Sequence, residues 1–370
     1  MLFCSGNPFT ELPAVLGLCP SLEMVGFKSC QIARIPDDAL PAQLRWLILT
    51  DNRIESLPAS IGRCSRLQKL MLAGNRLREL PPELAGCVRL ELLRISANRL
   101  QALPDWLGVM PRLSWLAFGG NPLNAALEAE ALARADGARF DWSRLQLQEQ
   151  LGEGASGVIH RAMLADGTAP REIALKRFKG DVTSDGLPES EMAAWLHAGE
   201  QPGLVPVLGQ VSGHPDGAQR LAMPLIGPAF SNLAGPPSLE SCTRDCYALD
   251  SRFGIDEIAA LARGIALTAA HLHQRGILHG DLYGHNILHD GKGRARLGDF
   301  GAASLFRPGH AAALQRIEAR AFGCLLEELL ERCPDPDDGR LSALEALRDD
   351  CLADAVARRP LFTEILRRLP

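Results

Sequence analysis

The first third of the chain is an internal repeat with a period of 23 residues. The same asparagine position recurs at Asn52, Asn75, Asn98 and Asn121, within a frame of the form L-x-x-L-x-L-x-x-N-x-L-x-x-L that is clearest around Asn75. A unit of this length cannot bury its own apolar side chains, so neighbouring units must stack around one shared core. The repeat therefore restricts this part of the chain to a solenoid.

The frame resembles that of the leucine-rich repeats. The resemblance covers residues 1–123 and implies an α/β solenoid in which each unit adds one short strand. We expect the asparagine side chains to bond loop backbone groups that would otherwise lack partners, in a ladder between coils. Cys19, Cys64 and Cys87 each precede a repeat leucine by three residues, which favours reduced thiols in the core.

The residues between the core leucines of each strand are expected to line the concave face of the solenoid. Four of them are of types that often anchor interfaces: Trp46, Met71, Arg94 and Trp115. One interpretation is that they bind a protein partner, because exposed clusters of this kind usually mark an interaction site. The other is that the C-terminal domain folds back onto them, and the sequence leaves both open.

Length and composition bound the remaining possibilities. A chain of 370 residues predicts two domains, and 46% hydrophobic with 22% charged residues indicates that both are globular. A net charge of -5 provides no basic field for nucleic acid, so we expect no nucleic-acid partner. The sequence has neither a signal peptide nor an apolar run of 18 residues, which predicts a cytoplasmic protein without a membrane partner.

After the repeat, the sequence predicts a cap helix and linker over 124–142 and a second domain over 143–370. A glycine-rich segment, Gly152-x-Gly154-x-x-Gly157-Val158, lies between two expected strands, where backbone amides can approach phosphate groups. Such a segment alone is weak evidence, because it also occurs in dinucleotide-binding folds. Here Ile173-Ala174-Leu175-Lys176 follows at the distance expected for a third strand, which places a lysine near those phosphates.

Residues 278–301 carry the most specific pattern of the second domain. Asp281 is followed by Asn286 five residues later and by Asp299 after a second apolar run. Asp281 can accept the proton of an attacking hydroxyl, while Asn286 and Asp299 provide oxygen ligands for magnesium. The order of these features predicts phosphoryl transfer.

These motifs resemble those of protein kinases over residues 143–369. The resemblance implies a two-lobed α+β fold with a small lobe at about 143–223 and a large lobe at about 227–370, binding ATP and Mg²⁺. Lys176 would hold the α- and β-phosphates and pair with Glu191, with Glu189 as the competing choice, while Asp281 would be the catalytic base. Met223 would gate the adenine pocket. The residues implied to contact the nucleotide are Gly152, Gly154, Ser156, Gly157, Val158, Ala174, Lys176, Met223, Leu225 and Leu288.

Several positions depart from the kinase pattern. Gly280 replaces the arginine that precedes the catalytic aspartate, and Tyr283 replaces the basic residue that steadies the γ-phosphate. Glu318 takes the place of a buried helix aspartate, and Arg359 lacks its partner because the Ala-Pro-Glu motif is absent. The activation segment is shortened to 302–317, where Ser304 is the sole hydroxyl, so we expect no switch by loop phosphorylation.

The sequence supports three functions. The first is an ATP-dependent protein kinase that phosphorylates Ser/Thr hydroxyls of itself or of a partner held by the repeats. The second is a small-molecule phosphotransferase of kinase-like fold, because the His279-Gly280-Asp281 triplet also occurs in such enzymes. The third is a pseudokinase scaffold that acts through the repeats. The set Lys176, Glu191, Asp281, Asn286 and Asp299 is complete, which favours catalytic competence.

Overall fold

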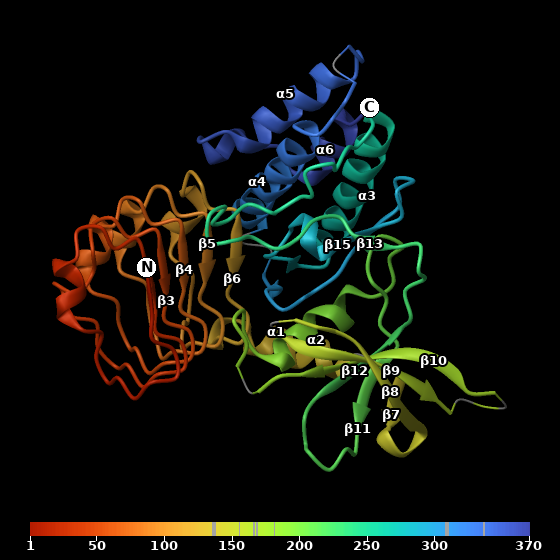
Figure 1. Ribbon diagram of the computed structural model, residues 1–370, viewed down its shortest axis with the longest axis horizontal. Helices are drawn as coiled ribbons and strands as arrows, with labels where there is room; N and C mark the ends of the chain where they lie inside the picture. Colours follow the sequence, from red (N-terminus) through yellow and green to blue (C-terminus); the bar gives the residue numbers. More distant parts are fainter. Residues whose placement is uncertain are drawn as a thin grey trace.

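The computed structural model describes residues 1–134, 138–154, 156–165, 167, 169–180, 182–307, 311–335 and 337–370. Figure 1 shows the repeat coils in red and orange beside a two-lobed unit, with a strand-rich lobe in yellow and green and a helical lobe in teal and blue. The expected fold class, an α/β solenoid followed by two lobes, is confirmed. None of the described helices combines the length and apolar composition needed to cross a membrane.

The repeat domain is built on one parallel sheet with the strand order β1-β2-β3-β4-β5-β6. Its strands are β1 (Leu2–Phe3), β2 (Met24–Gly26), β3 (Trp46–Ile48), β4 (Lys69–Met71), β5 (Leu92–Arg94) and β6 (Trp115–Ala117). Short 3-10 helices return the chain on the opposite side: η1 (Ala14–Leu18), η2 (Ala59–Arg63), η3 (Pro82–Gly86) and η4 (Asp105–Val109). The frame leucines fill the space between the two sides, and most of them are buried.

The predicted asparagine ladder is present. The Asn75 side chain donates to the carbonyls of Leu49 and Leu72, each at 2.9 Å, and accepts from Ile54 N at 3.0 Å. Asn98 repeats this pattern one coil further along, and Asn121 repeats it two coils further along. These bonds satisfy buried backbone groups that no strand can pair, which explains why the frame requires an amide at this position. Cys64 and Cys87 are buried free thiols, as predicted, and Cys19 is free and partly buried.

The segment after the repeats contains helix α1 (Pro122–Arg134) and strand β7 (Ala138–Asp141). Strand β7 pairs in parallel with β11 (Gly209–Ser212), so the small-lobe sheet takes in residues before 143. That sheet has the order β7-β11-β12-β10-β9-β8. Its other strands are β8 (Leu145–Glu153), β9 (Gly157–Leu164), β10 (Arg171–Phe178) and β12 (Arg220–Pro224), and η5 (Trp142–Arg144) joins β7 to β8.

The small lobe also carries helix α2 (Pro188–Ala198). The apolar residues between Leu204 and Leu208 form no strand. Strand β11 begins only at Gly209, and Leu204 instead makes an isolated bridge to Leu297 of the large lobe. Pro202 and Pro206 lack an amide donor and interrupt regular pairing in this stretch.

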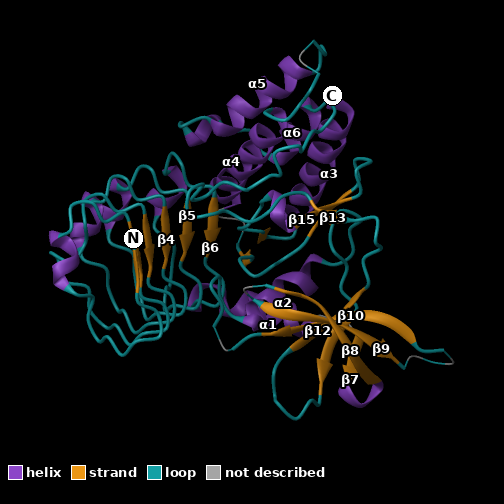
Figure 2. Ribbon diagram, viewed as in Figure 1, coloured by secondary structure: helices purple, strands orange, loops and turns teal. Residues whose placement is uncertain are grey.

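The large lobe is mainly helical (Figure 2). Its helices are α3 (Ile255–Gln274), α4 (Ala311–Leu330), α5 (Leu341–Leu352) and α6 (Phe362–Arg368), with η6 (Gly284–Asn286) and η8 (Val356–Arg358). Small strands form the sheets β13-β15-β16 and β14-β17. Their bounds are β13 (Ser231–Asn232), β14 (Ile277–Leu278), β15 (Ile287–His289), β16 (Ala295–Leu297) and β17 (Ser304–Leu305). Helix α4 is almost entirely buried and forms the centre of this lobe.

The concave face of the repeats is covered by the large lobe, so the prediction of a separate protein partner on this face is corrected. Trp46, Met71, Arg94 and Trp115 are 6%, 9%, 2% and 1% exposed, respectively. Trp46 donates through its indole N–H to the Cys242 sulfur, and Met71 and Trp115 belong to the same apolar cluster as the large-lobe core. The second interpretation is therefore right: these four side chains pack against the C-terminal domain of the same chain. A sequence pattern identifies an apolar face but not which surface covers it.

Candidate active site

Lys176 lies on β10, with its side chain directed toward α2. Its ammonium bonds Glu191 Oε1 and lies 3.7 Å from Asp299 Oδ1, and the residue is 5% exposed. Burial opposes the charge on Lys176, but the carboxylates of Glu191 and Asp299 outweigh it and raise the pKa of the lysine. Glu189 instead accepts a hydrogen bond from Gln219 at 3.0 Å, so the structure selects Glu191 of the two candidates.

The glycine-rich segment forms the turn between β8 and β9. A Cβ on Gly152 or Gly154 would meet nothing within 4 Å, so these two backbones border open space. A Cβ on Gly157 would lie 2.6 Å from the carbonyl oxygen of Arg177, which excludes any side chain there. Ser156 is buried, and its carbonyl accepts from Lys179 N at 3.1 Å. The segment therefore packs against β10 at Gly157, whereas it borders open space at Gly152 and Gly154.

Three of the residues expected to contact the adenine, Val158, Ala174 and Met223, lie in the same small-lobe sheet as Lys176, whereas Leu288 lies on β15 of the large lobe. Ala174 pairs with Met223 across β10 and β12, and both are buried. Val158 on β9 is 9% exposed, while Leu225 and Leu288 are partly buried and pack on the central apolar cluster. The residues expected to contact the adenine thus come from both lobes.

Asp281 and Asn286 lie in the loop after β14. The Asn286 amide donates to Asp281 Oδ2 at 2.8 Å and to the Asp281 carbonyl at 2.9 Å. Because the amide nitrogen is held in this way, the amide oxygen is the atom available as a ligand. The loop residues 281–286 are therefore closed into a compact turn by a single side chain.

Asp299 follows β16 in a left-handed backbone conformation with a φ of 49°. Its Oδ1 accepts from Gly301 N at 3.2 Å, and Gly298 N donates to the Asn286 carbonyl at 2.9 Å, which ties the two aspartate-bearing loops together. The Asp299 side chain is 47% exposed, so the desolvation of its carboxylate is partial. Lys176 and the Gly301 amide outweigh that desolvation and hold the pKa of Asp299 below its ordinary value.

A buried network supports the loop from below. His279 is fully buried, and its two ring nitrogens meet Gly298 O at 2.9 Å and Asp281 N at 3.3 Å. Glu318 Oε1 accepts from Gly280 N at 2.8 Å, and Oε2 bonds His273 at 2.6 Å. The longer side chain at 318 therefore reaches the loop, because α4 presents it directly beneath Gly280.

Sequence reasoning missed one residue of this site. Arg94, from the repeat strand β5, bonds Asp281 Oδ1 through Nη2 and the Gly280 carbonyl through Nη1 at 3.0 Å. The sequence contains two separate signs of this contact: glycine stands at 280 in place of the expected arginine, and Arg94 is among the residues expected on the concave face of the repeats. Only a fold that brings the two domains together connects them.

Three further residues of the large lobe also lie at the contact with the repeats: Tyr283, Arg359 and Ser304. Tyr283 stacks on Trp115, and Arg359 donates to the carbonyls of Ala353, Arg316 and, in the repeat domain, Pro111. Ser304 Oγ accepts from the backbone amides of Phe118 and Gly119 at 2.8 and 3.0 Å. Residues 308–310 of the shortened segment lie outside the described residues.

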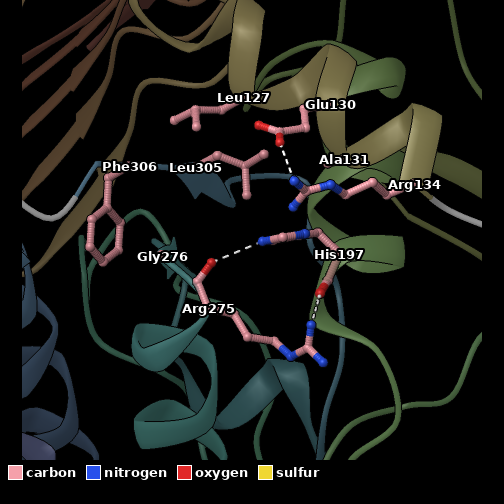
Figure 3. Close-up of a pocket in the computed structure, with 9 residues that line it drawn as sticks. All are labelled: Leu127, Glu130, Ala131, Arg134, His197, Arg275, Gly276, Leu305 and Phe306. Carbon is pink, nitrogen blue, oxygen red and sulfur yellow. Dashed lines mark hydrogen bonds and ion pairs between the residues drawn. The ribbon is translucent and has the colours of Figure 1, made fainter.

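A separate cavity of about 40 Å³ lies behind α2, where it meets α1 and the end of α3 (Figure 3). His197 bonds the Arg275 carbonyl at 3.0 Å, and the Arg275 guanidinium returns a bond of 3.0 Å to the His197 carbonyl. None of the expected site residues lines it. The cavity is a packing space at the junction of three helices rather than the site of chemistry.

The residues present fit a magnesium ion that is shared with phosphate groups. Among the described residues, no group of three or more His, Cys, Asp and Glu side chains forms a metal site of its own. Asn286 and Asp299 provide two hard oxygen ligands, and Mg²⁺ in such sites takes its remaining ligands from water and the nucleotide. These two ligands therefore suit a metal ion that enters the site bound to the nucleotide.

Two parts of the chain match known families. Residues 145–320 match the protein tyrosine and serine/threonine kinase family, and residues 42–100 and 65–123 match leucine rich repeats. The described structure agrees with both matches in fold.

The similar curated proteins are kinases. A DNA damage-responsive serine/threonine-protein kinase, RqkA of Deinococcus radiodurans, is 33% identical over 168 residues, covering 44% of this chain and 22% of the relative. The probable leucine-rich repeat receptor-like protein kinase At1g68400 of Arabidopsis thaliana is 29% identical over 220 residues, covering 50% of this chain and 29% of the relative. The chain thus spans less than a third of the length of either relative.

Proposed function

Because this chain joins leucine-rich repeats to a protein tyrosine and serine/threonine kinase domain, we propose that it is an ATP-dependent protein kinase acting on Ser/Thr hydroxyls. The observation that carries the proposal is the simultaneous presence of the Lys176–Glu191 ion pair, the Asp281–Asn286 turn and the Asp299 carboxylate 3.7 Å from Lys176 in one arrangement. In a kinase, the lysine–glutamate pair and the metal-binding aspartate must both be in place for transfer.

ATP would lie between the lobes, with its phosphates under the β8–β9 turn. Gly152, Gly154, Ser156 and Gly157 would present backbone to the phosphates, and Lys176 would contact the α- and β-phosphates. The adenine would lie among Val158, Ala174, Met223, Leu225 and Leu288. Asn286 and Asp299 would hold Mg²⁺, which neutralises charge on the bridging phosphate oxygens when bound.

The residues of the large lobe would then handle the acceptor. Asp281 orients the acceptor hydroxyl and takes its proton as the oxygen bonds the γ-phosphorus. The bond from the γ-phosphorus to the bridging oxygen breaks, and the electron pair leaves with ADP. Lys176, paired with Glu191, keeps the nucleotide in line for this displacement.

The acceptor would be a hydroxyl of the chain itself or of a protein bound by the repeats. Since the concave face is occupied, a partner would bind the outer coils or an edge of the solenoid. We also propose a cytoplasmic location, which ten free thiols support because disulfides are rare in a reducing compartment.

A small acceptor is the second candidate. Arg94 and Trp115 cover residues 280–283 from the repeat side, which narrows the approach to Asp281 for an extended peptide. A small hydroxyl compound would not need that space.

Transfer of labelled γ-phosphate tests the proposal. Wild-type protein and Asp281→Asn would each be incubated with labelled ATP and Mg²⁺, alone and with protein from cell extract. The proposal requires label in protein for the wild type and its loss in the variant. Equal incorporation by the two would exclude Asp281 from the chemistry, and label in small compounds alone would favour the second candidate.

A further inference from the structure

The guanidinium of Arg94 connects the repeat domain to both lobes at the reacting centre. Nε donates to Asp185 Oδ1 at 2.6 Å, Nη1 to the Gly280 carbonyl at 3.0 Å, and Nη2 to Asp281 Oδ1. The side chain is 2% exposed, so these bonds lie out of water. One residue of β5 thus contacts a small-lobe loop and the expected catalytic aspartate at once.

The site is built to keep a positive charge. Burial opposes ionisation of Arg94, but the carboxylates of Asp281 and Asp185 outweigh it and raise the pKa of the guanidinium. A buried arginine without partners would be strongly unfavourable, whereas charge-assisted bonds to two carboxylates offset its desolvation. The pairing is specific, because each of its three nitrogens has a different acceptor.

Gly280 shows why the charge comes from another domain. Its φ is 72°, and a Cβ there would lie 2.5 Å from the Leu116 carbonyl oxygen and 2.7 Å from that of Ala302. No side chain fits between the loop and β6. The arginine that kinases carry at this position is therefore incompatible with the docked repeats, and Arg94 of the repeat domain brings a guanidinium to the Gly280 carbonyl and to Asp281.

The bonds of Arg94 determine how Asp281 is presented. One carboxylate oxygen bonds Arg94 and the other bonds Asn286, so the plane of the carboxylate is fixed from two directions. The next peptide is held as well, because the Trp115 indole donates to the Leu282 carbonyl at 3.1 Å. The repeat sheet thus orients both the reacting side chain and its backbone.

The same guanidinium reaches the segment that leads into α2. Asp185 precedes this helix, which carries Glu191 and so positions Lys176. Glu128 of α1 accepts from Gly120 N at 2.8 Å, where the Leu187 and Ser190 side chains also lie close to the repeat backbone. Movement of the repeats would therefore disturb Asp281 and the Lys176–Glu191 pair together.

We propose that Arg94 is a positioning residue for phosphoryl transfer: it orients Asp281 and links it to the entry of α2, so that the docked repeats complete the active site. The inference rests on the proposed function. It implies that the arrangement is reached without phosphorylation of the segment after Gly301, because a guanidinium inside the fold already bridges the two lobes.

Steady-state kinetics of Mg²⁺-dependent ADP formation tests this inference with Arg94→Ala and Arg94→Lys. Arg94 contacts no nucleotide-binding residue named above, so Arg94→Ala should lower kcat by about 10- to 100-fold, as expected for a misplaced reacting group, while KM for ATP changes little. Arg94→Lys should recover part of kcat. Guanidinium chloride at low millimolar concentration should raise kcat of Arg94→Ala, whereas sodium chloride should not.

Thr243→Ala is the matched control. The Thr243 hydroxyl donates to Glu91 at the same interface, and its loss weakens docking without touching Asp281. A kcat of Arg94→Ala equal to that of Thr243→Ala, or above that of the wild type, would overturn the inference; the latter would mean that Arg94 restrains the enzyme.

Hydrogen exchange separates this inference from the proposed function. Amides of residues 279–286 should exchange faster in Arg94→Ala than in the wild type and in Thr243→Ala, and unchanged protection would contradict the link. If wild-type protein forms ADP no faster than Asp281→Asn, the proposed function fails. The positioning inference is then rejected for catalysis, whatever the exchange rates show.

Discussion

The indole of Trp115 lies flat against the ring of Tyr283, with ring centroids 4.2 Å apart and an interplanar angle of 7°. One ring belongs to the repeat sheet and the other to the loop that carries Asp281. The position at which kinases place a basic residue is thus occupied by an aromatic ring that joins the domains. Gly280, Tyr283 and Arg359 all contact the repeat domain, which occupies this side of the large lobe.

Replacing Trp115 by alanine should destabilise the protein by about 3–5 kcal/mol, the usual cost of removing a buried large aromatic side chain. Denaturant unfolding measures the change. Tyr283→Phe is the control: it keeps the stack and removes a buried hydroxyl that has no hydrogen-bond partner among the described residues, so it should be close to neutral. A loss below 1 kcal/mol for Trp115→Ala would show that the stack does not hold the domains together.

Gly280→Ala should destabilise the fold, because the added Cβ would collide with the Leu116 carbonyl. Gly217 provides the control, since its φ of 67° is similar but its surroundings are open. Gly217→Ala therefore reports backbone strain alone, and Gly280→Ala should cost about 1–3 kcal/mol more, as overpacking does. Equal losses in thermal unfolding would mean that β6 does not approach Gly280.

Ser304 should carry no phosphate in the folded protein, because it is fully buried and its oxygen accepts from two repeat amides. Ser304→Ala leaves these amides unpaired and should cost about 1–3 kcal/mol for each. ADP formation should persist in Ser304→Ala at a temperature where the variant is folded. Peptide mapping that finds phosphate on Ser304, together with lost activity in the variant, would contradict this account.

Glu318→Gln should show a pH-dependent loss of stability. His273 and the Gly280 amide outweigh burial and hold the pKa of Glu318 below its ordinary value of 4.5. The charge therefore stabilises the fold above pH 4.5, and this contribution disappears as pH falls through the lowered folded pKa. The Tm difference between wild type and Glu318→Gln should be largest near neutral pH and shrink in acid; a constant difference would rule out the ionised form.

Much of the fold could be predicted from local pattern. The repeat frame determined the solenoid, since its leucines and asparagines meet the same environment in every coil. The identity of Glu191 over Glu189 followed from spacing on α2. The apolar residues Leu204 and Val205 form no strand of the small-lobe sheet, because they pair with Leu297 of the large lobe instead.

The docking of the two domains could not be predicted, because it depends on side chains far apart in sequence. The Arg94 contact with Asp281 joins residues 187 positions apart in the sequence. The sequence around either residue gives no sign that the other is its partner. Trp46 and Trp115 look the same in a sequence whether a partner or the chain itself covers them. For this reason the expected catalytic set was visible from sequence, but its link to the repeats was not.

Magnesium-dependent ADP formation by wild-type protein beside Asp281→Asn tests the central claim most directly, because it needs no knowledge of the acceptor. Both proteins would be measured at saturating ATP and equal concentration, with folding verified by thermal unfolding. Removing a positioned general base typically costs about 10²–10⁴-fold, so the wild type should be faster by at least about 100-fold. Equal rates in two folded proteins would contradict the account.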